Sequence, residues 1–317
     1  MGARTPIPPS FRPAYLSLLE EGVLDARAAE AIRHLESCDL CARYCRVNRL
    51  EQPERAFCKT GRRAVVDSFG PHFGEEDPLR GWNGSGTIFF SRCNLRCVYC
   101  QNWPVSQGGE GREVDAEELA SVMLAIQGMG CHNVNLVSPS HVVAQIIEAV
   151  AIAARNGLRL PLVYNTGGYD SPEALALLDG IVDIYMPDMK YGDAEIARRL
   201  SKVLDYPRIN RMALKEMYRQ VGDLVLDGNG IALRGLLVRH LVLPGGLAGS
   251  EEVLGFIARE ISRETYLNIM DQYYPSYIAD KYPPLDRRIT EDEFRRVLDM
   301  AERFGLRRLD KRHARFF

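Results

Sequence analysis

The sequence predicts an α/β fold, a parallel (β/α)6-type partial TIM barrel, preceded by a small irregular N-terminal segment that is rich in cysteine. From about residue 86, short β-branched or aromatic runs alternate with helical patterns. These runs are apolar on consecutive residues, as expected for parallel strands that are buried on both faces. A doubly wound open sheet is the alternative, because periodicity alone does not separate the two architectures.

The individual elements follow from local patterns. The predicted strands are residues 87–91, 133–137, 161–165, 183–187, 236–243 and 266–270. Helix starts with capping signals are Asp115 with Glu118, Ser171 before Pro172, and Thr290 with Glu293. A further helix is expected near 25–37, and residues 206–235 predict a helix followed by a hairpin around the sequence DGNG. We therefore divide the chain into an N-terminal extension with a four-cysteine metal-binding module, residues 1–80, and a β/α barrel, residues 81–317.

The composition carries no membrane or nucleic-acid signature. The 317 residues are 46% hydrophobic and have a net charge of -2, so there is no global basic footprint for nucleic acid. No apolar run approaches the ~20 residues that a membrane helix needs. The start of the chain lacks the pattern of a signal peptide, and Pro6 does not fit a myristoylation motif. We expect a cytoplasmic protein that binds neither membrane nor nucleic acid.

Seven of the eight cysteines lie in two groups. In a reducing cytosol, clustered thiols bind metal or do chemistry more often than they form disulfides. One group, Cys93, Cys97 and Cys100, follows the first predicted strand. Thiolates suit iron–sulfur clusters or zinc, and three protein ligands leave one position open, as in a catalytic site. Tyr99, just before the last cysteine, fits a loop that packs against a cofactor.

Polar or glycine-rich segments follow every predicted strand. In chain order they are RCNLRCVYCQN, SPSH, NTGGY, PDMKYG, PGG and DQYYP. The carboxyl ends of the strands of a β/α barrel share one face, and active sites are built on that face. The pattern therefore predicts one active site assembled from segments that are far apart in the sequence.

The spacing C-x3-C-x2-C, with an aromatic residue before the last cysteine, resembles the signature of radical S-adenosylmethionine enzymes. The resemblance implies a [4Fe–4S] cluster on Cys93, Cys97 and Cys100, with S-adenosylmethionine bound to the fourth iron. One electron from the cluster then cleaves S-adenosylmethionine to methionine and a 5′-deoxyadenosyl radical, which abstracts a hydrogen atom. The family also implies a reductant such as flavodoxin or ferredoxin.

The likeness extends over nearly the whole chain, from about residue 38 to 305. The segments HFGEEDPLRGWNGSGTIFFSRCNLRCVYCQN, LVSPSH, LVYNTGGYD, DIYMPDMKYGD, RHLVLPGG and NIMDQYYP resemble an uncharacterised branch of the glycyl-radical (pyruvate formate-lyase) activating enzyme family. This implies a polypeptide substrate, a glycine of a partner glycyl radical enzyme. Modification of another protein or of a small molecule is one alternative. A non-catalytic iron–sulfur or zinc protein that carries electrons or binds a partner is another.

The resemblance also implies cofactor contacts at the strand ends. By position these are Asn165 and Thr166, Asp188 and Lys190, and Arg239 and His240. Lys190 would pair with the methionyl carboxylate. After the second strand, the better-known activators carry Gly-Gly-Glu, whereas this chain has Ser138, Ser140 and His141. Their hydroxyl and imidazole groups are the expected replacements, although His141 as a helix cap, and an Asp188–Lys190 pair of purely structural role, are the alternatives.

The other cysteine group is Cys38, Cys41, Cys45 and Cys58. Four ligands are typical of a closed site. Three interpretations are open: a zinc ion that holds a small module together, a second [4Fe–4S] cluster that passes electrons, or no metal. For the first group, a structural zinc site with Cys131 as its fourth ligand is the alternative.

Several polar residues outside these motifs have two interpretations. His72, Glu75 and Glu76 are interpreted as loop charges, although the family resemblance makes a functional role worth testing. Asn268, Gln272 and Tyr273 either line the substrate end of the site or complete the last strand.

Overall fold

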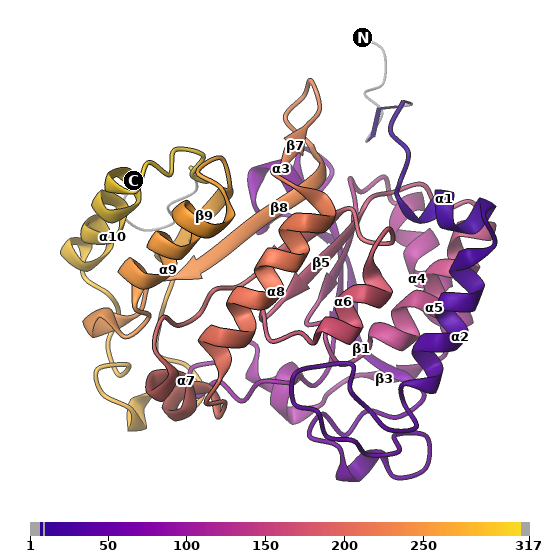
Figure 1. Cartoon of the computed structure of the whole chain (residues 1–317), viewed down its shortest axis with the longest axis horizontal. Helices are drawn as coiled ribbons and strands as arrows, with labels where there is room; N and C mark the ends of the chain where they lie inside the picture. The colour runs from indigo at the N-terminus through magenta and orange to yellow at the C-terminus, as the bar shows by residue number, and fades with distance from the viewer. Residues whose placement is uncertain (1–6, 9, 312–317) are drawn as a thin grey trace.

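The structure is a computed structural model that describes residues 7–8 and 10–311; Pro6 and the rest of the chain start discussed above lie outside these residues. The described residues form a nine-stranded sheet in the order β3-β1-β2-β4-β5-β6-β8-β7, with β9 paired to β8. The strands are β1 (Ala64–His72), β2 (Ser85–Phe90), β3 (Arg112–Val114), β4 (Val134–Val137), β5 (Leu162–Thr166), β6 (Ile184–Pro187), β7 (Val225–Leu226), β8 (Ala232–Leu241) and β9 (Tyr266–Met270). Figure 1 shows the strands in the middle of the molecule with helices outside them.

The parallel part of the sheet consists of β2, β4, β5, β6, β8 and β9. These strands neighbour one another in chain order, without the reversal that a doubly wound sheet has at its switch point. Each overlaps one of the six strands predicted from the sequence. Their carboxyl ends consequently lie at one edge of a mostly parallel sheet, as in a partial β/α barrel.

The helices lie between and after the strands. They are α1 (Tyr15–Glu20), α2 (Val23–Arg33), α3 (Asp77–Arg80), α4 (Ala116–Gly128), α5 (Val143–Arg155), α6 (Pro172–Leu178), α7 (Ala194–Ser201), α8 (Tyr206–Val221), α9 (Ser250–Phe256) and α10 (Glu291–Arg303). Capping boxes start α4 and α10, and Ser171 caps α6, as predicted. The hairpin around DGNG is formed by β7 and β8. Among the residues described, the structure contains no helix of the length and hydropathy that a bilayer crossing requires.

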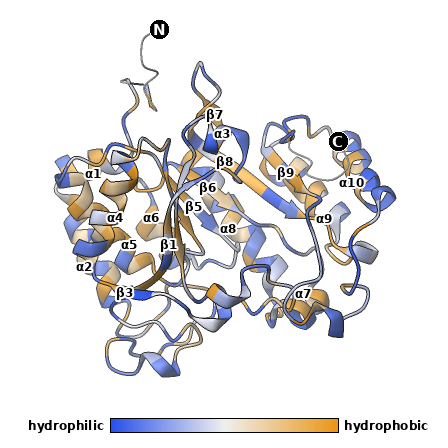
Figure 2. Cartoon of the chain, turned by 180° about the vertical axis from the view of Figure 1, so that it is seen from behind, coloured by the Kyte–Doolittle hydropathy of each residue, from blue (hydrophilic) through white to orange (hydrophobic). Residues whose placement is uncertain are grey.

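The N-terminal helices form an outer layer over α5. Most of the side chains of α5 are buried, because α1 and α2 pack on the side that faces away from the sheet. A helix that is apolar nearly all round needs such cover. Figure 2 shows apolar residues concentrated in the strands and on these packed helices.

The region before residue 81 also contains a strand that the sequence analysis missed. β1 pairs antiparallel with β2 on one side and with β3 on the other. Only its first three residues are buried, and Gly70 and Pro71 break any regular alternation. The strand therefore depends on pairing with β2 and β3 rather than on its own pattern. Residues 1–80 contribute to the sheet, and the division of the chain at residue 80 stays a proposal.

Candidate active site

Three cysteines stand in the loop that leaves β2 at the carboxyl edge of the sheet. Cys93, Cys97 and Cys100 all line one cavity there. Arg92, directly before them, has a φ of 70°, a conformation that costs a non-glycine residue on the order of 1–3 kcal/mol. This turn directs the chain out of the strand and into the cysteine loop.

Each of the three sulfurs has a hydrogen-bond donor close by. The Leu95 N–H donates to Cys93 Sγ over 3.4 Å, while Ser201 Oγ lies 3.0 Å from Cys97 Sγ and Ser106 Oγ lies 3.1 Å from Cys100 Sγ. Hydrogen bonds to cysteine sulfur help to set the potential of an iron–sulfur cluster. Neither serine was predicted: Ser201 is 104 residues from Cys97 along the chain, and Ser106 follows Cys100 by six residues without a recognisable motif.

Tyr99 is linked to the cysteine loop by a chain of hydroxyl groups. Its hydroxyl lies 2.7 Å from the hydroxyl of Tyr191, which in turn lies 2.7 Å from Ser201 Oγ. This chain of hydroxyls ends at Cys97 through Ser201. Tyr99 is buried and lines the cavity, and it also fixes the group that bonds Cys97.

Burial favours the protonated form of two of the three thiols. It raises the pKa of Cys93 to about 12 and also raises the pKa of Cys97. A buried thiolate is costly without a cation beside it, and a bound metal supplies that cation and displaces the proton. The loop is therefore suited to holding metal rather than to acting as a free nucleophile.

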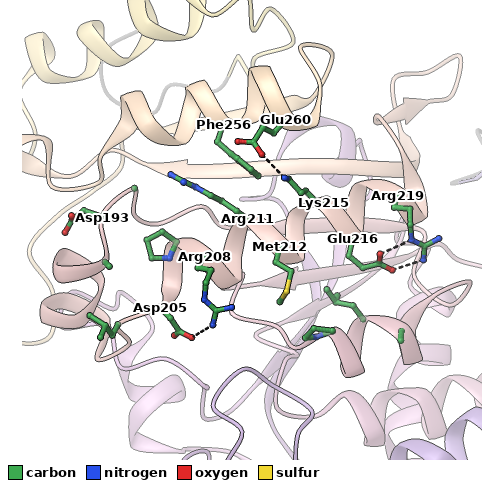
Figure 3. A pocket seen from close by; sticks show the side chains of 17 residues that line it. Asp193, Asp205, Arg208, Arg211, Met212, Lys215, Glu216, Arg219, Phe256 and Glu260 are labelled. Carbon is green, nitrogen blue, oxygen red and sulfur yellow. Dashed lines mark hydrogen bonds and ion pairs between the residues drawn. The ribbon is translucent and has the colours of Figure 1, made fainter.

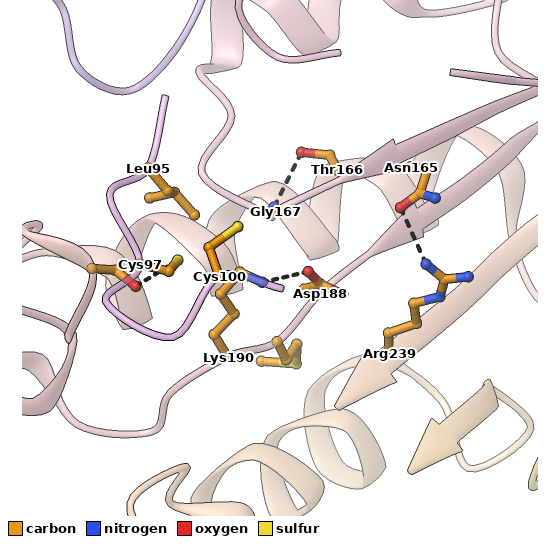
Figure 4. A network of polar contacts seen from close by, with 12 residues as sticks. Leu95, Cys97, Cys100, Asn165, Thr166, Gly167, Asp188, Lys190 and Arg239 are labelled. Atoms are coloured by element: carbon orange, nitrogen blue, oxygen red, sulfur yellow. Dashed lines mark hydrogen bonds and ion pairs between the residues drawn. The ribbon is translucent and has the colours of Figure 1, made fainter. Parts of the chain in front are cut away.

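The cavity beside the cysteines has a volume of about 410 Å³. Its wall includes residues from the ends of β4, β5, β6 and β8, and Figure 4 shows several of them around the cysteines. Of the predicted site residues, those that line it are Cys93, Cys97, Tyr99, Cys100, Ser138, Asn165, Thr166, Asp188, Lys190 and Arg239. Its size is within the range of small-molecule sites, and its residues come from segments far apart in the sequence.

Lys190 and Asp188 form an ion pair in this wall. Lys190 Nζ donates to Asp188 Oδ2 over 2.5 Å, and both side chains are mostly buried. Burial by itself favours the neutral amine, but Asp188 and Cys97 outweigh it and the pKa of Lys190 is raised well above its usual value. The ammonium group is thus retained beside the cysteines.

Arg239, from β8, meets two carboxylates on the other side of the cavity. Its guanidinium makes two 2.7 Å contacts with Glu76 and also contacts Glu75. Asn268 donates to Glu76 over 2.7 Å. The interpretation of Glu75 and Glu76 as loop charges is therefore wrong: both are almost fully buried and line the site. Burial opposes ionisation of Glu75, but Arg239 and His72 prevail and lower its pKa to about 2.

The ends of β4 and β5 hold a polar network. Ser138 has a φ of 59°, and its N–H donates to the carbonyl of Asn165 over 2.9 Å. Ser140 Oγ lies 2.9 Å from Thr166 Oγ1, which donates to buried Asp170 over 2.7 Å. Ser140 is therefore outside the cavity wall and positions Thr166, whereas Ser138, Asn165 and Thr166 line the cavity.

The two predicted histidines do not line the cavity. His141 is buried with Nε2 2.9 Å from the Ser91 carbonyl, and burial lowers its pKa to about 3. His240 is held between the Met189 carbonyl, 2.7 Å away, and Ser250 Oγ, 2.8 Å away. Sequence position suggested cofactor contact, but each imidazole turns toward the backbone of a neighbouring loop. They position the loops that carry Cys93 and Lys190.

A larger cavity of about 1130 Å³ lies over α8, between α6, α7 and α9 (Figure 3). Its charged residues are largely paired with one another: Arg208 with Asp205, Lys215 with Glu260, and Arg219 with Glu216. It contains no cysteine and shares no lining residue with the smaller cavity. We assign the chemistry to the smaller cavity, because only there do possible metal ligands and strand-end polar groups meet.

The cysteines of the two groups are all free thiols. In the described part of the chain, no three His, Cys, Asp or Glu side chains gather closely enough to hold a single metal ion. Cys131 precedes β4 and lies against Gly86 at the start of β2, whereas the three cysteines follow the end of β2. It is therefore at the wrong end of the sheet to complete a zinc site with them.

Comparison with known proteins identifies the family. Residues 87–222 match the model of the radical SAM superfamily. The uncharacterized protein MJ0674 of Methanocaldococcus jannaschii is 31% identical over 92% of this chain and 82% of its own length. The chain belongs to the radical SAM superfamily.

Two further similarities were found. The uncharacterized protein MJ0808 of the same organism is 23% identical over 78% of this chain and 73% of its own length. The crystal structure of a radical SAM methyltransferase from Sphaerobacter thermophilus aligns with 15% identity and a TM-score of 0.49 over 73% of this chain and 67% of that one.

Membership of the radical SAM superfamily implies a [4Fe–4S] cluster and S-adenosylmethionine as cofactors. The residues fit this pair. A cubane takes each thiolate on a different iron atom, so its ligands do not have to converge on one point. The cavity adds an ammonium group, a guanidinium group and amide groups next to the thiols. These groups suit a ligand such as S-adenosylmethionine, which carries both positive and negative charges.

Proposed function

We propose that this radical SAM protein cleaves S-adenosylmethionine reductively at a [4Fe–4S] cluster on Cys93, Cys97 and Cys100 and abstracts a hydrogen atom from a polypeptide. The single observation that carries the proposal is the shared cavity. It brings the three cysteines together with Asn165, Lys190 and other groups from distant strand ends.

The roles of the side chains follow from their charges. Lys190 would hold the carboxylate of the methionyl group while Asp188 holds Lys190 in place. Asn165 and Thr166 would orient the cofactor by hydrogen bonds from the end of β5. The surrounding buried residues would exclude water from a reactive radical.

The cluster and S-adenosylmethionine, when bound, supply one electron and a 5′-deoxyadenosyl radical that removes hydrogen from carbon. The protein's part is to hold the donor carbon of the substrate at the open side of the cavity and to keep competing hydrogen donors away. A flavodoxin or ferredoxin is the reductant we propose.

A polypeptide substrate is supported by the amide side chains of the cavity wall. They are Gln101, Asn102, Gln107, Asn268 and Gln272. A side-chain amide offers both a donor and an acceptor, which matches the N–H and C=O groups of a peptide backbone. The finer proposal, a glycine of a partner glycyl radical enzyme, rests on the resemblance described above and on this wall.

We also propose that Cys38, Cys41, Cys45 and Cys58 bind metal.

The test of cofactor cleavage uses anaerobically reconstituted protein, dithionite and S-adenosylmethionine. We expect 5′-deoxyadenosine from the wild type and from Cys131→Ala, and none from Cys97→Ala. Cys131 is the matched control because it is a buried cysteine outside the site. A wild-type protein with an intact cluster that yields no deoxyadenosine would contradict the proposal and favour a non-catalytic protein.

The test of substrate class uses an extract of cells that carry this gene, grown in heavy water and separated by dialysis. The reconstituted protein is incubated with each fraction, and deuterium is measured in deoxyadenosine. We expect label from the macromolecular fraction, with loss of that label after protease treatment. Label that comes from the small-molecule fraction alone would replace the polypeptide with a metabolite.

A further inference from the structure

Arg49 is a buried cation without a carboxylate partner. Only 2% of it is exposed. Its Nε donates to the Thr60 carbonyl over 2.6 Å, its Nη2 to the His141 carbonyl over 2.8 Å, and its Nη1 to Cys38 Sγ over 3.4 Å. Within residues 7–8 and 10–311, no ion pair with an acidic side chain involves it.

A guanidinium stays charged in proteins, so the structure must supply a negative charge nearby. A buried charge that is left uncompensated costs several kcal/mol. Besides its contact with Cys38 Sγ, Arg49 bonds the carbonyl of Thr60, two residues after Cys58, so the cation lies beside the cysteine group. Neutral thiols would not balance the cation, whereas thiolates bound to metal in a centre of net negative charge would.

The loops around these cysteines are held in unusual conformations. Tyr44 and Arg46, on either side of Cys45, have φ values of 45° and 53°, and Lys59, directly after Cys58, has a φ of 53°. The Phe57 N–H donates to Cys45 Sγ over 3.5 Å, which brings Cys45 beside the turn that carries Cys58. Such strain persists only where the surroundings enforce it, and it is concentrated at these cysteines.

We propose that Cys38, Cys41, Cys45 and Cys58 hold a second [4Fe–4S] cluster, charge-balanced by Arg49, which passes electrons to the cluster on Cys93, Cys97 and Cys100. This inference rests on the proposed function for the electron's destination, but not for the metal itself. A cubane fits the four cysteines because each thiolate meets its own iron atom.

The two cysteine groups are connected by direct contacts. The guanidinium of Arg43 stacks on the Phe57 ring, 3.7 Å from its centroid, and donates from Nε to the Asn94 carbonyl over 2.7 Å. Arg96 also donates to the Phe57 carbonyl, over 3.4 Å. Phe57 is next to Cys58, and Asn94 is next to Cys93. In Figure 1 the indigo loops that follow α2 lie along the lower edge of the molecule, below the sheet.

The electron balance is simple. A reduced second cluster gives one electron to the oxidised first cluster and returns to its own oxidised state. A low-potential one-electron donor of the flavodoxin or ferredoxin class then reduces it again. The contacts of Arg43 with Phe57 and with the Asn94 carbonyl would give this transfer a short path.

The test of the second cluster is metal and sulfide analysis after anaerobic reconstitution with iron, sulfide and zinc all present. We expect about eight iron atoms per wild-type chain and about four in the variant Cys93→Ala, Cys97→Ala, Cys100→Ala, since each cubane holds four. The control Cys131→Ala should match the wild type. Zinc without sulfide in the triple variant, or about four iron atoms in the wild type, would overturn the proposal. None of these counts depends on cleavage of S-adenosylmethionine, so the proposed function can fail separately.

The role of Arg49 is tested in the same triple variant. Arg49→Met should lower the reduction potential of the remaining cluster or prevent its assembly, because the added electron loses a neighbouring positive charge. Arg49→Lys keeps the charge and should retain the cluster with a smaller shift, as measured by redox titration with electron paramagnetic resonance. An unchanged potential in Arg49→Met would show that the guanidinium does not balance the cluster.

Discussion

Arg239 and Glu76 form a two-pronged ion pair across the wall of the cavity: Nε lies 2.7 Å from Oε1, and Nη2 lies 2.7 Å from Oε2. Glu76 stands directly before α3, whereas Arg239 lies near the end of β8. The pair therefore ties the segment before the first barrel strand to the fifth, and both side chains are mostly or fully buried.

Glu76→Gln should destabilise the protein. The substitution leaves the shape nearly unchanged but removes the charge that faces Arg239. Breaking a buried pair by changing one partner costs on the order of 3 kcal/mol. The free energy of unfolding, measured by urea denaturation under anaerobic conditions, should fall by about this amount. The exposed pair of Glu291 and Arg295 provides the control, and Glu291→Gln should change stability little. Equal effects at the two sites would show that burial of the pair does not matter.

Lys190→Met should weaken binding of S-adenosylmethionine. The substitution keeps most of the length of the side chain and removes the ammonium group beside Cys97. A hydrogen bond to a charged group contributes about 1.5–3 kcal/mol, so the dissociation constant should rise about tenfold or more. Equilibrium dialysis with the reconstituted protein measures it.

The matched control for Lys190 is Lys215→Met. Lys215 is paired with Glu260 over 2.7 Å in the larger cavity. The substitution Lys215→Met should leave the dissociation constant of S-adenosylmethionine unchanged. An effect of Lys215→Met that equals the effect of Lys190→Met would place the cofactor in the larger cavity instead.

Ser201→Ala should lower the reduction potential of the cluster on the three cysteines. A hydrogen bond to cysteine sulfur stabilises the reduced cluster, which carries more negative charge. Ser201 lies 3.0 Å from Cys97 Sγ, so its loss disfavours reduction. Redox titration followed by electron paramagnetic resonance measures the shift. Ser121→Ala, at an exposed serine of α4, should have no effect; a potential that rises in Ser201→Ala would be the wrong sign for this account.

Asp183 should make stability depend on pH. Burial raises its pKa to about 7, although the N–H groups of Ala14 and Leu162 oppose the shift. In the unfolded chain the carboxyl group has its ordinary pKa near 4. The folded state therefore holds this proton over the window from about pH 4 to about pH 7, and the stability it provides is lost as pH rises through that window.

The measurement for Asp183 compares the wild type with Asp183→Asn in urea at several pH values. The difference in unfolding free energy, wild type minus variant, should fall by a few kcal/mol as pH increases from about 4 to about 7. Because the two proteins share all other titrating groups, the contributions of those groups to the unfolding free energy cancel in the difference. A difference that rises with pH would mean that the buried carboxyl is held as the anion.

The sequence carried enough information for the parallel strands and the capped helices. Buried parallel strands are apolar without a break, and caps such as Asp115 with Glu118 are local signals. The strand β1 could not be found in this way, because only its first three residues are buried and Gly70 and Pro71 interrupt the pattern that would mark a strand. The order of the strands likewise came only from the structure.

Part of the site could also be predicted from the sequence, but for a different reason. The spacing of the cysteines and the position of Lys190 after a strand predicted that these residues lie near one another, and all of them line the cavity. The burial of Glu75 and Glu76 was not predicted, because it depends on Arg239, more than 160 residues away along the chain. An adjacent acidic pair before a strand, together with an arginine within a buried strand, is the signal that could have linked them. His141 follows β4 and His240 lies near the end of β8, but the sequence does not report the direction of an imidazole.

The most direct measurement of the central claim is electron–nuclear double resonance on the reduced protein with S-adenosylmethionine that is isotopically labelled at the amino nitrogen. The account predicts a coupling between that nitrogen and the cluster in the wild type and in Cys131→Ala, and its absence in Cys97→Ala. A wild-type protein that contains the intact, reduced cluster on Cys93, Cys97 and Cys100 but shows no such coupling at saturating S-adenosylmethionine would contradict the account.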